Sequence, residues 1–397
     1  MSNNENNEIR DSFTSKTGFI LACIGSAVGM GNIWLFPYRV GQFGGAAFLI
    51  PYIIFIVLLG YTGLMGEFAF GRMTQTGPIG SFKKALETRN KSWGGFLGII
   101  PVIGAFGIAV GYAVVVGWFL RFLGGFITGS AMSAADSGAY FGELASPFGS
   151  IIWHLLALIL VSIVLISGIS KGIETMNKIM MPAFYILFVI VMVRVFMLDG
   201  AFEGIKYLVV PKWSSLMEPK TWIYALGQAF FSLSLAGSGM IVYGSYLKRD
   251  VDIMSSAKNT VIFDTLGAFL AGLVIIPAVF AFNLDPASGP PLLFITIPSV
   301  FKLMPFGRLF GVIFFISVLF ASITSLMNLL EVPIEAVQST FKLKRKLSVF
   351  IVVGAAFIFG LFAEDGNNLG VLMDFVSIYI IPIGAFIAAR SEERRVG

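Results

Sequence analysis

The chain contains 397 residues, of which 57% are hydrophobic and 12% are charged, and its formal net charge is +5. With a mean hydropathy of +0.88 it is too apolar for a water-soluble fold, so the composition predicts a membrane protein. The apolar segments do not alternate polar and apolar residues as barrel strands do. The 45 glycines are typical of spanning helices that pack closely in lipid. We therefore expect an all-α polytopic membrane protein.

The N-terminal segment, residues 1–16, is polar and lacks a basic n-region. We expect it to be a cytoplasmic tail and not a cleaved signal peptide. Ten apolar segments of roughly 20 residues follow, the length that the hydrocarbon core requires. Since ten is even, both ends of the chain are expected on one side. The predicted spans are residues 17–40, 46–71, 95–123, 149–168, 178–198, 221–247, 259–283, 305–338, 347–363 and 368–389.

Lysine and arginine are distributed unevenly over the connections between these spans. If the N-terminus is cytoplasmic, nineteen of the 27 basic residues lie on the cytoplasmic side, whereas residues 124–148 contain none. This is the positive-inside pattern. The net charge therefore indicates topology, and no nucleic-acid partner is implied. The cytoplasmic set is Arg10, Lys16, Arg72, Lys83, Lys84, Arg89, Lys91, Lys171, Lys178, Lys248, Arg249, Lys258, Lys342, Lys344, Arg345, Lys346, Arg390, Arg394 and Arg395.

Cysteine and histidine each occur once. Cys23 excludes an internal disulfide and a multi-thiolate metal site. His154 alone cannot form a metal cluster or a proton relay. We expect Cys23 to be a packing residue and His154 to be a helix residue near an interface. Together with the scattered acids, they provide no nucleophile, acid–base pair or metal cluster, which argues against a membrane-embedded enzyme.

Glycine interrupts two of the predicted spans near mid-membrane. The first span contains Gly25-Ser-Ala-Val-Gly-Met-Gly31, and the sixth contains Ser232-Leu-Ser-Leu-Ala-Gly-Ser-Gly239. Glycine is a poor helix former, so we expect both helices to be unwound there. Two broken helices, five spans apart, predict a 5+5 inverted repeat (17–200 and 221–389, joined by an extracellular connection at 201–220) with the substrate between the breaks. The alternative is that these glycines only allow helices to pack closely.

An unwound helix exposes amides and carbonyls that lipid cannot satisfy. Half-helix N-termini bind anions such as a carboxylate, and freed carbonyls with hydroxyls suit a hard cation such as sodium. The nearby hydroxyls are those of Ser232, Ser234, Thr324 and Ser325.

Two acids lie inside apolar spans, where charge is costly and presumed functional. Glu67 in the second span is placed to accept hydrogen bonds from unwound amides, a structural role. Asp264 lies in the otherwise apolar seventh span. A sodium ion beside it would keep it charged.

The segment Gly25-Ser-Ala-Val-Gly-Met-Gly-Asn-Ile-Trp-Leu-Phe-Pro37 resembles the first-helix signature of the neurotransmitter:sodium symporter (NSS) family, whose bacterial amino-acid transporters have the leucine-transporter fold. Further matches keep the family order from residue 10 to about 389. They are Gly66-Glu67, Tyr112 with Trp118, Gly168-Ile-Ser-Lys-Gly-Ile-Glu174, Gln228-Ala-Phe-Phe-Ser-Leu-Ser234, Ala321-Ser-Ile-Thr-Ser325 and Met373-Asp-Phe375.

The resemblance implies a sodium-coupled symporter of the bacterial inner membrane that imports a zwitterionic amino acid by alternating access. An amino-acid sensor or an ion-conducting protein on the same scaffold is the alternative, because fold does not fix function. The oligomeric state is not predicted.

The resemblance also implies a substrate site, two sodium sites and an outer gate. The substrate residues would be Ala27, Met30, Gly31, Ile108, Tyr112, Phe231, Ser232, Ser234, Gly237, Ser325 and Leu329. The first sodium would be held by Ala27, Asn32, Ser232, Asp264 and the substrate carboxylate, and the second by Gly25, Val28, Ala321, Thr324 and Ser325. The gate would comprise Arg39, Gln228, Phe231 and Asp374.

Three departures from the family pattern sharpen the substrate and ion predictions. Gly29 replaces the aspartate of monoamine transporters, so the substrate must bring its own carboxylate. Asp264 stands where the leucine transporter has a neutral asparagine, and the residue one turn later, Ala268, carries no charge. We therefore expect Asp264 to supply the negative charge, and chloride is not expected. Gly237 replaces a bulky residue and favours an aromatic or long aliphatic substrate.

The gate and the C-terminal end also depart from the pattern. Leu35 stands where the family has its gate arginine, and Arg39 lies one helical turn further on. We predict that Arg39 bridges to Asp374; the alternative is that Arg39 reaches to the membrane surface. Residues 390–397 form a short polar tail, which is expected to be truncated or foreign sequence.

Overall fold

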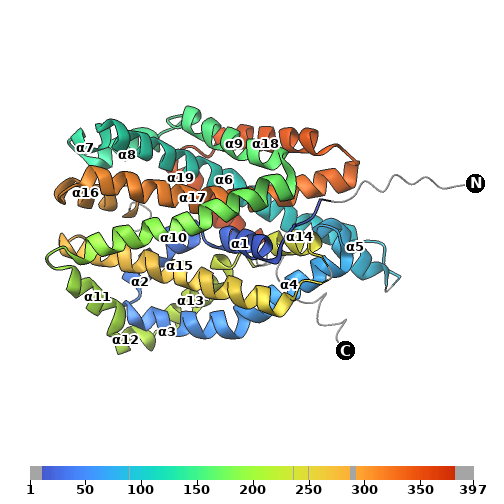
Figure 1. Cartoon of the computed structure of the whole chain (residues 1–397), viewed down its shortest axis with the longest axis horizontal. Helices are drawn as coiled ribbons and strands as arrows, with labels where there is room; N and C mark the ends of the chain where they lie inside the picture. The colour runs from blue at the N-terminus through green and yellow to red at the C-terminus, as the bar shows by residue number, and fades with distance from the viewer. Residues whose placement is uncertain (1–10, 89, 236, 249, 287–291, 381–397) are drawn as a thin grey trace, which may run out of the picture.

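The computed structural model describes residues 11–380 except 89, 236, 249 and 287–291, and the regular elements among them are all helical. Figure 1 shows α1 (Lys16–Ala27) near the middle of the molecule. One layer contains α6 (Gly94–Thr128) and α17 (Gly307–Phe341), and another contains α15 (Ile253–Ala281). The predicted all-α membrane fold is confirmed.

Each of the ten predicted spans contains a helix, but they differ in continuity. Five described helices are long and apolar enough to cross a membrane: Ala46–Thr74, Gly94–Thr128, Ile169–Phe196, Ile253–Ala281 and Gly307–Phe341. The first of these joins α3 (Ala46–Phe55), η2 (Ile56–Gly60) and α4 (Tyr61–Thr74). The fourth predicted span is the shorter α9 (Ile151–Ile166), and the ninth is α18 (Arg345–Leu361). The tenth contains α19 (Gly366–Phe375) and η5 (Val376–Ile380); its predicted end and the 390–397 tail lie outside the described residues.

The two predicted breaks are confirmed. Helix α1 ends at Ala27, Val28 is extended, and the chain resumes as η1 (Gly31–Leu35) and α2 (Phe36–Gln42) after a bend of 49°. The sixth span divides into α13 (Pro219–Ser232) and α14 (Gly239–Ser245). Between these halves, Ser234 and Ser238 have φ values of +53° and +59°, a left-handed conformation that non-glycine residues rarely adopt.

The fifth span begins earlier than predicted. We expected it to start at residue 178, but helical structure begins at η3 (Ile169–Glu174) and continues through α10 (Thr175–Phe196). The polar residues Ser170, Lys171 and Glu174 are typical of a connection between two spans. Glu174 is nonetheless buried, accepting hydrogen bonds from Thr14, Ser15 and Lys178, so the turn is packed against the start of the chain.

Short helices cap the two ends of the bundle. Helix α5 (Pro78–Glu87) lies at the end where the described chain begins, and α7 (Ser130–Ser133), α8 (Ser137–Leu144), α11 (Ala201–Val209), α12 (Trp213–Leu216) and α16 (Thr296–Leu303) lie at the other. Asp136 caps α8 by accepting hydrogen bonds from the amides of Gly138 and Ala139. These hydrogen bonds lower the pKa of its carboxyl group. Helix α5 and the other short helices therefore lie at opposite ends of the bundle, as expected if successive predicted spans cross the membrane in opposite directions.

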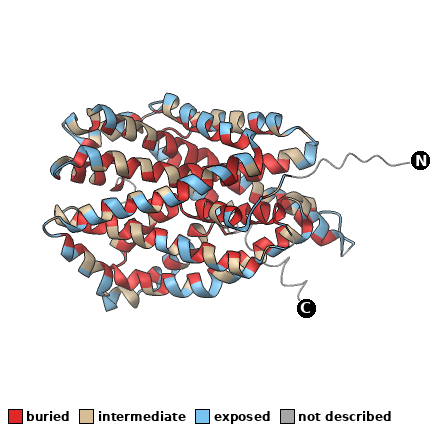
Figure 2. Cartoon of the chain, in the orientation of Figure 1, coloured by how far each residue is buried: buried red, intermediate tan, exposed pale blue. Residues whose placement is uncertain are grey.

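Figure 2 shows buried residues along the inside of the bundle and exposed residues on its outer surfaces. Many exposed residues are large and apolar, among them Leu58, Ile152 and Phe350, as expected where lipid is the solvent. Cys23 is fully buried in the core, as predicted. His154 is also fully buried, and its Nδ1 lies 3.3 Å from Glu364 Oε1, so it forms a polar pair between α9 and the segment after α18.

Candidate substrate and sodium sites

The carbonyl end of α1 meets the middle of α17 in an oxygen-rich cluster. The carbonyl oxygens of Gly25, Ser26 and Val28 each lie 3.1 Å from the Ser325 hydroxyl. On α17 the Thr324 hydroxyl donates to the Ala321 carbonyl at 2.9 Å. The break leaves the last carbonyls of α1 without helical partners, which is why they are available here. All five residues predicted for the second sodium belong to this cluster, and its donor set is neutral oxygen only.

A residue that sequence reasoning missed lies beside this oxygen cluster. Asn177 on α10 is buried, its amide donates to the Ile173 carbonyl at 2.8 Å, and its Oδ1 has no hydrogen-bond partner among the described residues. A Cβ at Gly25 would lie 1.8 Å from that oxygen. Gly25 is therefore required by the close approach of α10 as well as by the break.

Asp264 is the centre of a second cluster, on the other side of the first break. Its Oδ1 accepts from Asn32 Nδ2 at 2.8 Å, and its Oδ2 accepts from Ser232 Oγ at 2.7 Å. Asn32 Nδ2 also lies 3.1 Å from Ser232 Oγ, and all three residues are fully buried. The three side chains predicted for the first sodium are thus brought together from η1, α13 and α15. Both carboxylate oxygens act as acceptors, as those of an ionised group do.

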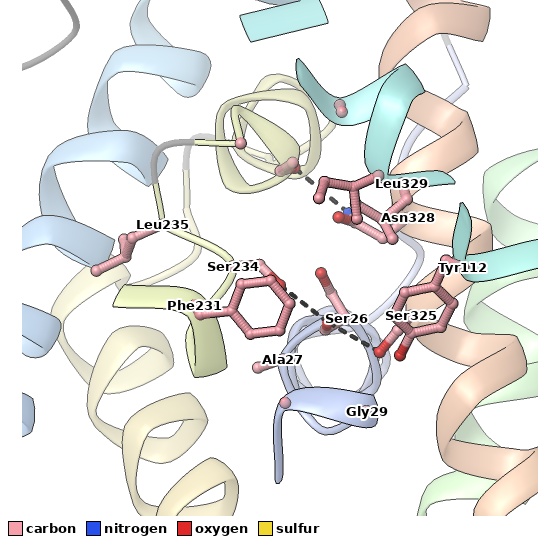
Figure 3. Close-up of a pocket in the computed structure, with 15 residues that line it drawn as sticks. Ser26, Ala27, Gly29, Tyr112, Phe231, Ser234, Leu235, Ser325, Asn328 and Leu329 are labelled. Carbon is pink, nitrogen blue, oxygen red and sulfur yellow. Dashed lines mark hydrogen bonds between the residues drawn. The ribbon is translucent and has the colours of Figure 1, made fainter. Parts of the chain in front are cut away.

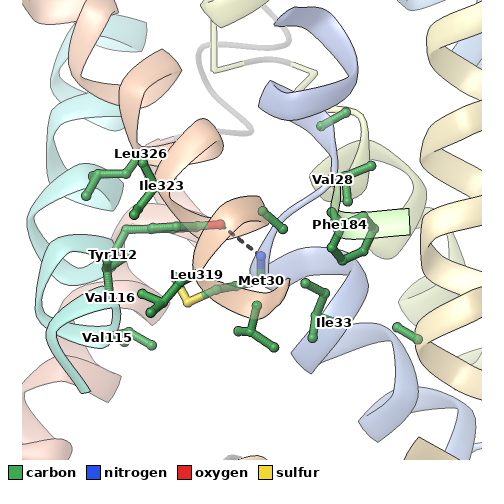
Figure 4. Packing of buried hydrophobic residues seen from close by; sticks show 14 of the residues in the cluster. Val28, Met30, Ile33, Tyr112, Val115, Val116, Phe184, Leu319, Ile323 and Leu326 are labelled. Carbon is green, nitrogen blue, oxygen red and sulfur yellow. Dashed lines mark hydrogen bonds between the residues drawn. The ribbon is translucent and has the colours of Figure 1, made fainter. Parts of the chain in front are cut away.

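The amide end of the first break lies against α6. The Tyr112 hydroxyl accepts a hydrogen bond from the Met30 amide at 2.8 Å, as Figure 4 shows. Gly31 opens the next helical segment, so its amide is among the first-turn donors that lack helical partners. A Cβ at Gly29 would lie 2.3 Å from both the Tyr112 hydroxyl and the Ser325 hydroxyl. A side chain at position 29 would therefore require these two hydroxyls to move.

A cavity lies between the two breaks, α6 and α17 (Figure 3). Nine of the eleven predicted substrate residues line it: Ala27, Gly31, Ile108, Tyr112, Phe231, Ser234, Gly237, Ser325 and Leu329. The Met30 side chain is buried in the apolar core instead (Figure 4), and Ser232 belongs to the Asp264 cluster. The lining residues that were not predicted are Ser26, Gly29, Ala105, Leu235, Gly239 and Asn328.

Gly237 leaves space in this cavity. A Cβ at this position would meet only the Ser234 carbonyl, at 3.9 Å. The predicted open volume at residue 237 is therefore present in the cavity.

The predicted outer gate is only partly assembled in this structure. Gln228 is buried and donates to the Gly31 carbonyl at 2.7 Å, and Phe231 lies over Gly31, whose Cβ would be 3.0 Å from its ring. Arg39 donates to the Tyr224 carbonyl at 3.0 Å and stacks on the Tyr224 ring. Asp374 is exposed on α19. The expected contact between Arg39 and Asp374 is absent from the described ion pairs, because Arg39 is held by α13 instead.

Glu67 is buried in α4, which packs against α14, the half-helix after the second break. Its role as an acceptor for unwound amides stays a prediction.

These observations define a class of protein: a multi-pass helical membrane transporter with its site between two broken helices. Comparison with known proteins gives the family. Residues 10–132 and 141–389 match the model of the sodium:neurotransmitter symporter family, and the chain belongs to this family. It is therefore a sodium-dependent membrane transporter.

Two relatives and one solved structure show how far the similarity extends. An uncharacterized sodium-dependent transporter of Bacillus subtilis, YhdH, is 38% identical over 94% of this chain and 86% of its own length. The sodium-dependent serotonin transporter of Drosophila melanogaster is 29% identical over 93% of this chain and 66% of its own. The crystal structure of MhsT in complex with L-phenylalanine superimposes with a TM-score of 0.88 and 36% identity, covering 96% of this chain and 89% of that one. The last match confirms the leucine-transporter fold.

Proposed function

We propose that this transporter imports a zwitterionic amino acid together with two sodium ions, without chloride, by alternating access. The observation that carries the proposal is the placement of one cavity between an anion-binding end, made by the first break and Tyr112, and two oxygen clusters. The crystal structure of MhsT, which is similar to this chain, contains L-phenylalanine and supports the same substrate class.

The substrate's carboxylate follows from what position 29 lacks. An amine without a carboxylate would need a protein acid beside it, and Gly29 supplies none, nor is any acidic residue among the described residues that line the cavity. An amino acid supplies its own carboxylate to the amides at the start of η1 and to the Tyr112 hydroxyl. The same carboxylate completes the ligands of the first sodium, so the ion and the substrate bind each other directly.

The charge balance of the first site supports independence from chloride. One sodium ion and the Asp264 carboxylate cancel, and a zwitterion adds no net charge. A neutral residue at position 264 would leave one positive charge in a buried site, which an added anion would have to offset. With Asp264 present, a chloride ion would instead create an excess negative charge.

The transport cycle that we propose uses the broken spans as the moving part. Sodium stabilises the outward-open site, the amino acid completes the first sodium site, and the bundle of spans 1, 2, 6 and 7 rocks to release both inside. The positive-inside distribution of lysine and arginine supports a cytoplasmic N-terminus in a bacterial inner membrane.

The experiment that tests this function is uptake of a panel of amino acids into proteoliposomes with and without an inward sodium gradient. We expect accumulation of one or more zwitterionic amino acids only with the gradient, unchanged when gluconate replaces chloride at constant sodium. Equal uptake in both sodium conditions would exclude sodium coupling. Loss of uptake in gluconate would show that Asp264 does not provide the missing charge.

A further inference from the structure

The cavity contains two polar side chains that the proposed backbone and sodium contacts do not use, Ser26 and Asn328. Ser26 is the penultimate residue of α1, and Asn328 lies one turn after Ser325 on α17. Both line the cavity, and they are only 3% and 1% exposed. Figure 3 shows them on facing sides of it.

The Ser26 hydroxyl has no hydrogen-bond partner among the described residues. Its carbonyl is used, because it accepts from Ser234 and Ser325 at 3.0 and 3.1 Å. Several other buried serines donate to a carbonyl of their own helix, as Ser322 does to the Val318 carbonyl at 2.7 Å. A buried hydroxyl without a partner costs about 1–3 kcal/mol. The position of Ser26 Oγ is consistent with a partner that arrives with the substrate.

The Asn328 carboxamide is fixed but has hydrogen-bonding capacity left. Its nitrogen donates to the Gly239 carbonyl at 3.5 Å, the long limit for such a bond. A Cβ at Gly239 would lie 2.1 Å from Asn328 Oδ1, so the side chain is wedged against the start of α14. A carboxamide offers two N–H donors and an acceptor oxygen, more than this long contact and its side-chain contact with the buried Tyr243 hydroxyl use.

The remaining walls determine what kind of side chain these groups can meet. Ala105, Ile108, Leu235 and Leu329 are apolar, and Gly237 leaves space beside them. No acidic or basic residue is among the described residues that line the cavity, so a charged side-chain tip would be unpaired. The cavity therefore suits a broad apolar body that ends in a neutral hydrogen-bonding group.

We infer that the substrate is an aromatic amino acid whose ring carries a hydroxyl, and that Ser26 and Asn328 recognise this hydroxyl. The inference rests on the proposed function and deepens it by naming the substrate class. A phenolic hydroxyl both donates and accepts, so one group satisfies both side chains. Phenylalanine has the same ring without the hydroxyl and leaves them unpaired, a situation that sites built for a hydroxyl discriminate against strongly.

The test compares L-tyrosine with L-phenylalanine, which differ by this one hydroxyl. The dissociation constant of each is measured on the purified full-length protein in saturating sodium and again without sodium. We expect wild type to bind tyrosine about tenfold more tightly than phenylalanine, equivalent to about 1.4 kcal/mol. Ser26→Ala and the isosteric Asn328→Leu should each weaken tyrosine binding and bring the ratio close to one. The matched control Ser322→Ala, on α17 but outside the cavity, should keep the wild-type ratio.

The possible outcomes separate this inference from the proposed function. Equal or tighter binding of phenylalanine by wild type, with sodium dependence retained, overturns the inference and leaves the function standing. An unchanged ratio in Ser26→Ala also overturns it, and this variant decides the matter if Asn328→Leu does not fold. If neither amino acid binds in a sodium-dependent manner, the proposed function fails and the inference fails with it.

Discussion

The two predicted sodium sites lie on opposite sides of the same break, yet they are built differently. The first is formed around a buried carboxylate, Asp264, with Asn32 and Ser232 from two other helical segments. The second consists of carbonyls at and just after the end of α1, with the Ala321 carbonyl and two hydroxyls of α17, and it contains no charged side chain. If both clusters bind sodium as we propose, this difference predicts that charge balance and coupling to the substrate belong to the first site. The second site is then expected to affect sodium affinity and the packing of α1 on α17.

Removal of the Asp264 charge should have the largest effect. In Asp264→Asn the carboxamide keeps the shape but not the charge beside sodium, a loss of about 4 kcal/mol for charges 4 Å apart at intermediate dielectric. The sodium concentration for half-maximal uptake should rise roughly a thousandfold, and added chloride should partly restore uptake. Both expectations are tested by measuring uptake across a series of sodium concentrations, with and without chloride.

A control for the Asp264 variant lies on the same helix. Asp252 caps α15 by accepting from the Met254 amide, and it is exposed. Asp252→Asn keeps the cap and should leave the sodium dependence unchanged. An equal effect of both variants would mean that the result reflects the net charge of the protein and not a sodium ligand.

Thr324→Val should have a smaller effect, confined to the neutral second site. It removes one hydroxyl without changing size, and a contact to a charged partner contributes about 1.5–3 kcal/mol. Half-maximal sodium should rise about tenfold to a hundredfold, and chloride should not restore it. In Thr260→Val, where the lost hydroxyl donates only within α15, sodium dependence should not change. Rescue of Thr324→Val by chloride would contradict the distinction between the two sites.

A pair of glycine substitutions tests the space between the sites. Gly29→Ala places a methyl group 2.3 Å from the Tyr112 and Ser325 hydroxyls, and overpacking of this kind costs about 1–3 kcal/mol. Gly237→Ala enters open space and should change affinity by about twofold or less. The amino-acid affinities of the two variants, measured side by side, test this difference. If Gly237→Ala were the more damaging one, the cavity would not extend towards residue 237.

Loss of the Arg39 side chain should have a modest effect, because it lies outside both ion clusters. Arg39→Ala removes the contacts with Tyr224, and a cation–π contact contributes about 0.5–2 kcal/mol. The transport rate should fall a few fold. The swap of Arg39→Asp with Asp374→Arg tests whether the two residues pair in another state of the cycle. Restoration of uptake lost in either single variant supports pairing; no restoration indicates that Arg39 acts through Tyr224 alone.

The sequence predicted the features that depend on local chain chemistry. Glycine clusters located both breaks, and apolar length located the spans. The cluster at Asp264 could be predicted only through family resemblance, because Asn32, Ser232 and Asp264 are far apart in the chain. Ser26 and Asn328 were missed, since a serine or asparagine in an apolar helix usually bonds to its own backbone. Only the fold reveals that the Ser26 hydroxyl is unpartnered and faces a cavity.

The partner of Arg39 was missed for a related reason. Helical spacing places Arg39 on the same face as Leu35, but it does not determine which neighbouring helix approaches that face. In the structure α13 does, through Tyr224. The early start of η3 was likewise hidden, because its buried Glu174 is hydrogen-bonded by Thr14 and its first amide by Asp11, contacts that the local sequence does not reveal.

Direct ligation of the first sodium by the substrate is the central claim, and reciprocal binding measurements test it most directly. The affinity for the best-transported amino acid is measured across a sodium series, and the affinity for sodium is measured with and without that amino acid. We expect each ligand to increase the affinity for the other by the same factor, and this factor should fall close to one in Asp264→Asn. Amino-acid affinity that does not change with sodium in the wild-type protein would contradict the account.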